Sequence, residues 1–301
     1  MGGLEPDGVP PWAPRRPVIV IGDICEDIMI RADASRFSRE SPVPVFDLRG
    51  HEAAEGGMGN VMRQLRLWGI QVRPVVLARR PTIRLVAGCP EQQVARLDGR
   101  WQLLSRAAVD AELSRIRRIA PSAAVYVDYR GRSGPEAAVR RFLEGLSCPA
   151  IADARRSLLG WDKSAILKMS EPDARTEGGE QAPGAERGFR SHLADLRYQA
   201  GLPTLVLTRN CRGHAVITEK AVRVSPAVSL AGPILNVSGA GDVFTAVLAA
   251  VLASRHEAGA GITACDTEQA CATAARAAAI RVRKPGYNEA VTWREMTETF
   301  P

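Results

Sequence analysis

The sequence predicts an α/β fold in which a mostly parallel β-sheet lies between two layers of helices and carries a small β lid. Short apolar runs typical of strands alternate with longer stretches of helical periodicity along the 301 residues. This alternation predicts parallel strands covered by helices on both faces. Two proline-containing extended segments do not fit the centre of such a sheet and predict the lid.

The alternation predicts five strands and six helices. The first strand, PVIVIGDI at 17–24, is a continuous apolar run that ends in Gly-Asp. Segment 59–69 is an amphipathic helix, with Val61 and Leu65 on one face and Gly69 as its stop signal. The other strands are predicted at 123–129, 149–153, 164–170 and 203–209, and the other helices at 104–119, 134–146, 187–200, 240–254 and 266–283.

The lid is predicted from FSRESPVPVFDL at 37–48 and TIRLVAGCPEQQVARLD at 82–98, whose prolines at 42, 44 and 90 oppose a central strand position. We expect one domain over 17–301, with the lid formed by about 31–50 and 82–98. The segments expected outside regular structure are a flexible leader at 1–16 and a polar loop at 172–188.

Composition narrows the classes of function. The net charge of +7 could suggest nucleic-acid binding, but only four of the 40 basic residues are Lys, and aromatic residues make up 5%. No stripe of basic and stacking side chains is visible, so we expect no nucleic-acid partner. A phosphorylated small substrate would use the surplus positive charge equally well. No apolar run approaches the roughly 20 residues of a membrane span, and the Cys spacing fits no metal site. We expect a cytoplasmic protein with no membrane partner.

Polar residues follow the predicted strands at the edge where open α/β sheets bind ligands. A carboxylate there can accept hydrogen bonds from paired sugar hydroxyls. For any one residue, a solvated turn is an equally good explanation. These strand-end residues are Asp23, Asp27, Asp128, Asp153, Glu171 and Thr208.

A first glycine motif, GGMGN at 56–60, precedes the early amphipathic helix. Gly56 and Gly57 allow close backbone approach to a ligand, and Asn60 adds an amide in the first turn. The alternative is a helix start whose glycines serve packing.

A second glycine motif, SGAGD at 238–242, precedes the late apolar helix. Free N–H groups of Gly239, Ala240 and Gly241 at a helix start favour an anion. Asp242 then has two interpretations. It either complements the helix dipole without chemistry, or it deprotonates the hydroxyl that attacks a bound phosphoryl group.

The ordered set of these motifs resembles the PfkB/ribokinase family of carbohydrate kinases, and most closely the heptose-7-phosphate kinase half of bifunctional ADP-heptose synthases. The resemblance runs from about residue 17 to 298 and implies a ribokinase-like three-layer α/β/α sandwich. The segments SRFSRESPVPV, KMSEPDA, TRNCRG and RKPGYNEAVTWREM are similar to elements of that family. With no nucleotidyltransferase half after residue 301, a stand-alone kinase is expected.

The resemblance also implies a role for each matching residue. Asp242 is the general base, and the N–H groups of Gly239, Ala240 and Gly241 form the anion hole. ATP and Mg²⁺ are the implied cofactors, with Glu171 acting through Mg²⁺ or its water. A homodimer through the lid is the implied assembly. The residues implied for the sugar or sugar phosphate are Asp23, Asp27, Gly56, Gly57, Asn60 and Asp128, with lid residue Arg36 added as a candidate phosphate contact. The residues implied for the nucleotide side are Lys168, Glu171, Thr208, Arg209 and Gly213.

Four departures from the family pattern keep a second hypothesis open. Asn236 replaces the usual Asp at the head of the late motif, which weakens any cation site there. Lys168 replaces an Asn and could contact phosphate directly or displace Mg²⁺. The span from Leu77 to Thr82 is shorter than in the family, and Arg130 stands where a small residue or a Lys-Gly pattern is common. The chain is therefore either an ATP-dependent sugar kinase or a catalytically weakened homologue that binds sugar or nucleotide as a regulator or scaffold.

Overall fold

The structure is a computed structural model that describes residues 8–88, 91–130, 137–155, 165–177, 186–259 and 261–301. Its strands form one sheet in the order β11-β10-β9-β8-β7-β6-β1-β3-β4, with β2 paired to β1 and β5 to β3. The described strands are β1 (Val18–Phe37), β2 (Pro44–Gly57), β3 (Val72–Ala87), β4 (Gln92–Asp98), β5 (Gln102–Leu103), β6 (Ala123–Asp128), β7 (Ala150–Ala154), β8 (Ala165–Ser170), β9 (Thr204–Thr208), β10 (His214–Thr218) and β11 (Val222–Ser225).

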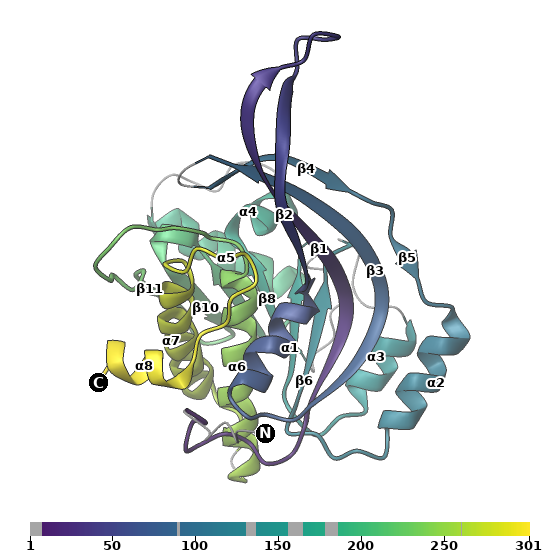
Figure 1. Ribbon diagram of the computed structural model, residues 1–301. Helices are drawn as coiled ribbons and strands as arrows, with labels where there is room; N and C mark the ends of the chain where they lie inside the picture. The colour runs from purple at the N-terminus through teal and green to yellow at the C-terminus, as the bar shows by residue number, and fades with distance from the viewer. Residues whose placement is uncertain (1–7, 89–90, 131–136, 156–164, 178–185, 260) are drawn as a thin grey trace.

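The sheet is mostly parallel, as predicted. Strands β3, β1, β6, β7, β8 and β9 run parallel, and the remaining pairings are antiparallel. Helices cover both faces (Figure 1). The described helices are α1 (Met58–Leu67), α2 (Arg106–Ile116), α3 (Ala137–Glu144), α4 (Glu171–Glu177), α5 (Glu186–Gln199), α6 (Ala240–Glu257), α7 (Ala264–Arg281) and α8 (Trp293–Thr299).

Alternation of side chains along β1 divides the core into two layers. Val18 and Val20 pack toward α1, α6 and α7, whereas Ile19 and Ile21 pack toward α2, α3 and α5. All four side chains are fully buried. Two-sided burial explains why this strand is a continuous apolar run.

Strand β1 does not end at Gly22–Asp23 as the sequence predicted. It continues to Phe37, because β2 pairs with it from Ile24 onward and β3 pairs with it as far as Ala32. The far ends of β1 and β2 form the hairpin that projects from the body in Figure 1. The predicted lid segments therefore lie on strands that are continuous with the main sheet.

Strand β3 also continues from the body into the lid. It passes without interruption through residues 77–82, the span that is short relative to the family pattern, and then pairs with β4. Pro44 occupies the first position of β2, where proline removes no central ladder hydrogen bond. Pro90 lies outside the described residues.

The described part of the predicted leader packs onto the body, which corrects the expectation of a flexible segment. Trp12 contacts Trp68 and Trp293 in edge-to-face geometry, with ring centroids 5.8 and 5.6 Å apart. The backbone N–H groups of Arg15 and Arg16 donate to Glu257 at the end of α6. Residues 1–7 lie outside the described residues.

The predicted loop at 172–188 is also partly wrong. Helix α4 occupies its start and α5 begins at Glu186, whereas residues 178–185 are not described. Strands β10 and β11 and helix α8 are additional elements that the alternation did not reveal. Within the described ranges, no helix combines the length and the apolar character needed to cross a membrane.

Candidate active site

The N-terminus of α6 is the centre of the candidate site. Its N-cap, Gly239, has φ 77°, a left-handed conformation that glycine adopts readily. A methyl group at Gly239 would lie 3.5 Å from Nδ2 of Asn60. Asn60, in the first turn of α1, thus lies beside the turn that was predicted to bind an anion.

Asp242, in the first turn of α6, is 3% exposed. Both of its carboxylate oxygens accept hydrogen bonds: Oδ2 from Nδ2 of Asn60 at 2.7 Å and Oδ1 from the phenol of Tyr129 at 2.6 Å. Burial raises the pKa of Asp242, and the two hydrogen bonds oppose this rise. Burial also raises the pKa of Tyr129, so its phenol stays protonated and donates. The carboxylate is therefore held in one orientation and has a raised pKa.

Lys168, on β8, lies beside the same turn. Its Nζ donates to both oxygens of Asp153 at 2.9 and 3.0 Å and lies 3.5 Å from the carbonyl oxygen of Gly241. The hydroxyl of Thr245 donates to the same Asp153 carboxylate at 2.5 Å. The ammonium is buried. A fixed positive charge thus stands at the helix start, where the resemblance placed nucleotide contacts.

Glu171 does not fit the predicted Mg²⁺ ligand. Its Oε2 accepts hydrogen bonds from Nε of Arg209 at 3.3 Å and from Nη2 of Arg212 at 2.7 Å. Two guanidinium groups therefore neutralise the carboxylate that a metal ion would need. The described residues contain no group of three or more His, Cys, Asp or Glu able to hold a metal ion. Glu171 and Arg209 lie together, and their pairing does not fit Glu171 as a direct Mg²⁺ ligand. Action of Glu171 through a water on Mg²⁺ stays a prediction.

Asp23, predicted to bind sugar, is fully buried in β1. Nε of Arg130 lies 2.9 Å from its Oδ1, and the backbone N–H of Tyr129 donates to its Oδ2. Burial raises the pKa of Asp23 to about 6, against the opposing effect of Arg130, and the nearby Asp128 raises it further. The strand-end carboxylates Asp23 and Asp128 thus do lie together. Asp23 is paired with Arg130 in this conformation, and contact between Asp23 and a sugar hydroxyl stays a prediction.

Asp27 is likewise paired, with Nε of Arg84 on β3 at 3.0 Å. A methyl group at Gly56 would lie 2.3 Å from Oδ2 of Asp27, and one at Gly57 would lie 2.8 Å from the carbonyl oxygen of Asp23. The two glycines therefore permit close approach between β2 and β1. Packing between the two strands is thus a sufficient reason for both glycines. That they also let a ligand approach the backbone remains a prediction.

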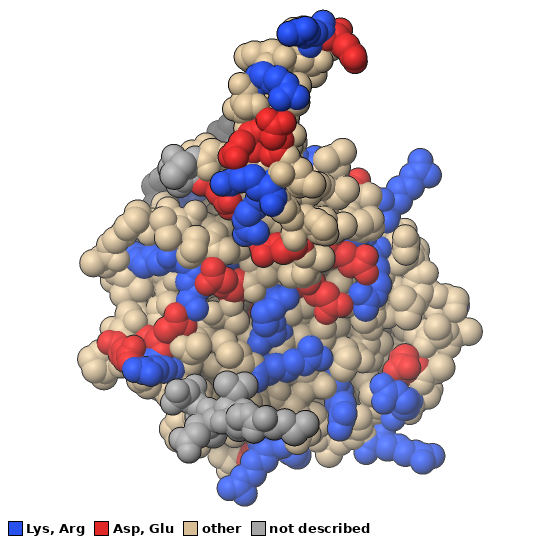
Figure 2. All heavy atoms as spheres, in the orientation of Figure 1, with Lys and Arg blue, Asp and Glu red and all other residues tan. Residues whose placement is uncertain are grey.

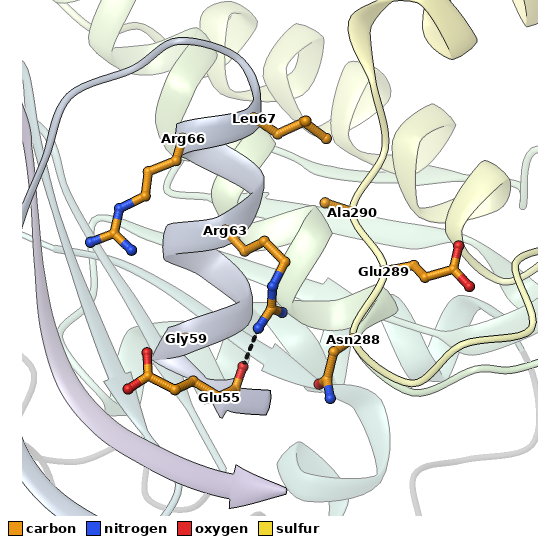
Figure 3. A pocket seen from close by; sticks show the side chains of 8 residues that line it. All are labelled: Glu55, Gly59, Arg63, Arg66, Leu67, Asn288, Glu289 and Ala290. Carbon is orange, nitrogen blue, oxygen red and sulfur yellow. Dashed lines mark hydrogen bonds between the residues drawn. The ribbon is translucent and has the colours of Figure 1, made fainter. Parts of the chain in front are cut away.

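A cavity of about 590 Å³ adjoins the site between α1 and the segment that follows α7 (Figure 3). Nη1 of Arg63 donates to Oδ1 of Asn60 at 2.6 Å, and Nη2 donates to the carbonyl oxygen of Glu55. Arg66 also lines this cavity, and Figure 3 shows its side chain directed away from the Asn288 segment. Arg63 therefore connects the cavity to Asp242 through Asn60.

The structure does not bring Arg36 to this site. Its side chain is 64% exposed and pairs with Asp47 across the projecting hairpin. Other charges on the hairpin pair in the same way, as Arg31 does with Glu52, and Figure 2 shows both signs intermixed along it. Local charge pairing accounts for the lid arginines in this conformation, and a phosphate contact of Arg36 stays a prediction.

The remaining nucleotide-side predictions lie at the β9–β10 turn. Thr208 ends β9, and its hydroxyl donates to the carbonyl oxygen of Met169. A methyl group at Gly213 would lie 2.1 Å from the carbonyl oxygen of Ser225, so glycine is required there by packing. Their contact with a nucleotide remains a prediction.

Sequence reasoning gave no role to several residues that the structure places in the site. Tyr129 follows a strand-end Asp, and Asp153 was noted only as another strand-end carboxylate. The guanidinium of Arg155 stacks 4.1 Å from the Tyr129 ring centroid. The sequence places all three residues at or just after the end of a strand, which is the one signal it offers for them. Which residues they contact depends on other strands and can be seen only in the fold.

Known proteins share this architecture. The profile of the pfkB family of carbohydrate kinases matches residues 91–294, more than half of the chain. The chain belongs to this family. Its relatives include the bifunctional protein HldE of Nitrobacter winogradskyi, 26% identical over 94% of this chain, and that of Rhodopseudomonas palustris strain TIE-1, 25% identical over 90%. The chain spans less than two thirds of these relatives, 63% and 61% of their lengths.

Solved structures show the same fold at low identity. Ribokinase of Arabidopsis thaliana, complexed with ribose and ATP, superposes with a TM-score of 0.65 at 14% identity, over 94% of this chain and 98% of that one. Phosphofructokinase-2 of Escherichia coli, in complex with potassium, superposes with a TM-score of 0.68 at 10% identity, over 94% and 97%. The ribokinase-like fold predicted from the sequence is confirmed.

Proposed function

We propose that this family member transfers the γ-phosphoryl group of ATP to a hydroxyl of a phosphorylated sugar of the heptose 7-phosphate type. The observation that carries the proposal is the position of Asp242, a buried carboxylate one residue after the Gly239–Gly241 turn at the start of α6. Phosphoryl transfer to a hydroxyl requires a site that binds the phosphoryl group and a base that takes the proton of the hydroxyl. The turn would supply the first and Asp242 the second.

The proposed reaction needs no covalent intermediate. The terminal phosphoryl group of ATP binds the N–H groups at the start of α6, and Asp242 takes the proton of the attacking sugar hydroxyl. The ammonium of Lys168, fixed by Asp153, supplies positive charge on the nucleotide side. The oxygen–phosphorus bond to the sugar forms as the bond to ADP breaks.

The guanidinium groups next to Asn60, a residue predicted to bind the sugar, support the proposal that the substrate carries a phosphate. Arg63 and Arg66 line the cavity that adjoins Asn60, and guanidinium groups are well suited to phosphate. Similarity to the HldE proteins favours a heptose phosphate. Arg66→Ala is expected to raise KM for the sugar phosphate and to leave KM for the unphosphorylated sugar unchanged. Equal effects on both KM values would contradict a phosphate contact.

The primary test is a phosphoryl-transfer assay with ATP over a panel of sugars and sugar phosphates. Turnover of a phosphorylated seven-carbon sugar in preference to the unphosphorylated form supports the proposal. Preference for an unphosphorylated sugar would be consistent with a sugar kinase but would reject a sugar phosphate as its substrate.

A second function is favoured by the pairing of the site carboxylates. Both oxygens of Asp242 are occupied, and Asp23 and Asp27 are ion-paired to Arg130 and Arg84. We propose, as the alternative, a weakened kinase homologue that binds sugar or nucleotide without turnover. Calorimetric binding of ATP or sugar phosphate by a chain that transfers no phosphoryl group would select this alternative.

A further inference from the structure

Arg281, the last residue of α7, is a fully buried arginine behind the anion site. Its Nη1 donates to the carbonyl oxygen of Lys284 at 3.3 Å, and its Nη2 donates to that of Gly286 at 2.5 Å. Among the described residues, its Nε has no hydrogen-bond partner. A methyl group at Gly239 would lie 3.6 Å from this nitrogen. The unused donor therefore lies beside the turn that starts α6.

The guanidinium has no ion-pair partner among the described residues. Burial lowers the pKa of Arg281, while Glu289 and Asp242 act in the opposite direction. Arginine nevertheless remains charged in proteins. A buried charge without a direct ion-pair partner is costly, and an anion at the start of α6 would add a negative charge close to this guanidinium.

The loop at 284–286, which accepts hydrogen bonds from Arg281, also accepts hydrogen bonds from the side chain of Asn236. Nδ2 of Asn236 donates to Pro285 at 3.2 Å and to Gly286 at 3.4 Å, while its Oδ1 accepts from the N–H of Ser238. Converging carbonyl oxygens are ligands of a kind that hard cations use. Because the amide of Asn236 and the guanidinium of Arg281 already donate to them, these carbonyls do not fit a bound metal cation.

We infer that Arg281 is the resident cation of the anion site and takes the place of a dissolved monovalent cation. Its guanidinium fixes the carbonyls of the loop at 284–286 and adds positive charge behind the Gly239 turn. It acts on the bound phosphoryl group through that turn, so it is a positioning residue. This inference rests on the proposed function only in taking ATP as the source of the anion.

The test compares ATP affinity, measured by calorimetry, in wild type, Arg281→Gln and Arg281→Ala. Gln keeps donors for the loop carbonyls and removes the charge, so it remains informative if Ala impairs folding. The matched control is Arg283→Ala. Arg283 also donates to backbone carbonyls, those of Ala279, Leu230 and Ala231. Each variant is measured in potassium chloride and in choline chloride at equal ionic strength, and with added guanidinium.

Wild type is expected to bind ATP equally in potassium and choline. Arg281→Gln is expected to lose about ten- to hundredfold in affinity, and potassium or guanidinium is expected to restore part of the loss in Arg281→Ala. Wild-type affinity in Arg281→Gln, the same loss in Arg283→Ala, or a potassium requirement in wild type would overturn the inference. A wild type that binds ATP but phosphorylates no sugar would reject the proposed function alone, because the affinity ratios would still decide the role of Arg281.

Discussion

The phenol of Tyr129 donates a 2.6 Å hydrogen bond to Oδ1 of Asp242, and the amide of Asn60 donates to the other oxygen. Tyr129 directly follows β6, whereas Asn60 and Asp242 lie in the first turns of α1 and α6. The carboxylate is thereby held in one orientation at the start of α6. Both donors oppose the effect of burial on the pKa of Asp242.

Tyr129→Phe removes one of these donors. We expect the pKa of Asp242 to rise further, because the variant loses a hydrogen bond that favours the charged carboxylate. A base with a higher pKa is protonated up to a higher pH, so the acid limb of the pH profile of kcat/KM should move upward. An unmoved acid limb in an active Tyr129→Phe enzyme would contradict the coupling.

The buried pair of Lys168 and Asp153 makes a prediction about stability. Lys168→Met leaves the Asp153 carboxylate without its counter-charge, and the free energy of unfolding should fall by about 3–5 kcal/mol. The double variant with Asp153→Asn should recover most of this loss without recovering ATP affinity. Urea denaturation and calorimetry measure the two quantities. The control, exposed Lys220→Met, should change stability by no more than about 0.5 kcal/mol.

For that pair, additive stability losses in the double variant would show that the two charges do not interact. Full recovery of ATP affinity would show that Lys168 has no role toward the nucleotide.

Asp23 makes a prediction about pH. Its pKa of about 6 in the folded chain lies above the ordinary value of 3.8. Between these values the folded state holds a proton that the unfolded state has lost, so this group's contribution to stability is present below pH 3.8 and declines up to about pH 6. The decline amounts to about 1–3 kcal/mol.

Carboxyl NMR titration of wild type and Arg130→Ala tests this assignment. Arg130 lowers the pKa of Asp23, so its removal should raise that pKa above 6. An ordinary pKa in wild type, or a fall in the variant, would contradict the buried pairing.

Arg36→Ala tests the predicted phosphate contact of the lid. Because Arg36 is exposed and pairs with Asp47 across the hairpin, its removal should leave KM for the sugar phosphate unchanged and alter stability by no more than about 0.5 kcal/mol. Steady-state kinetics measure KM for the sugar phosphate in Arg36→Ala and Arg66→Ala side by side. A rise in KM for Arg36→Ala that matches the rise for Arg66→Ala would return the lid arginine to the site.

Local sequence patterns predicted the parts of the structure that depend on local interactions. The glycine turn before Asp242 predicted the start of α6, which begins at Ala240. The spacing in 59–69 predicted α1. Strand alternation predicted the parallel sheet, because strands buried on both faces must be apolar.

Pairings between distant segments could not be predicted in this way. The extension of β1 past Gly22 depends on hydrogen bonds to β2 and β3. The packing of Trp12 depends on Trp68 and Trp293. In the site, Arg130 appeared only as a departure from a family pattern, and its partner Asp23 is more than a hundred residues away. Arg281 gave no signal, because a basic residue at the end of a helix is expected on local grounds alone.

The central claim is that Asp242 is the base of a sugar kinase. The most direct measurement is the rate of phosphoryl transfer from ATP to sugar phosphates by wild type and by Asp242→Asn, with ATP binding measured in both. We expect wild-type turnover and a loss of about 10²–10⁴-fold in the variant, with ATP binding retained. If both proteins bind ATP and neither phosphorylates any sugar in the panel, or if the variant is as fast as wild type, the claim is contradicted.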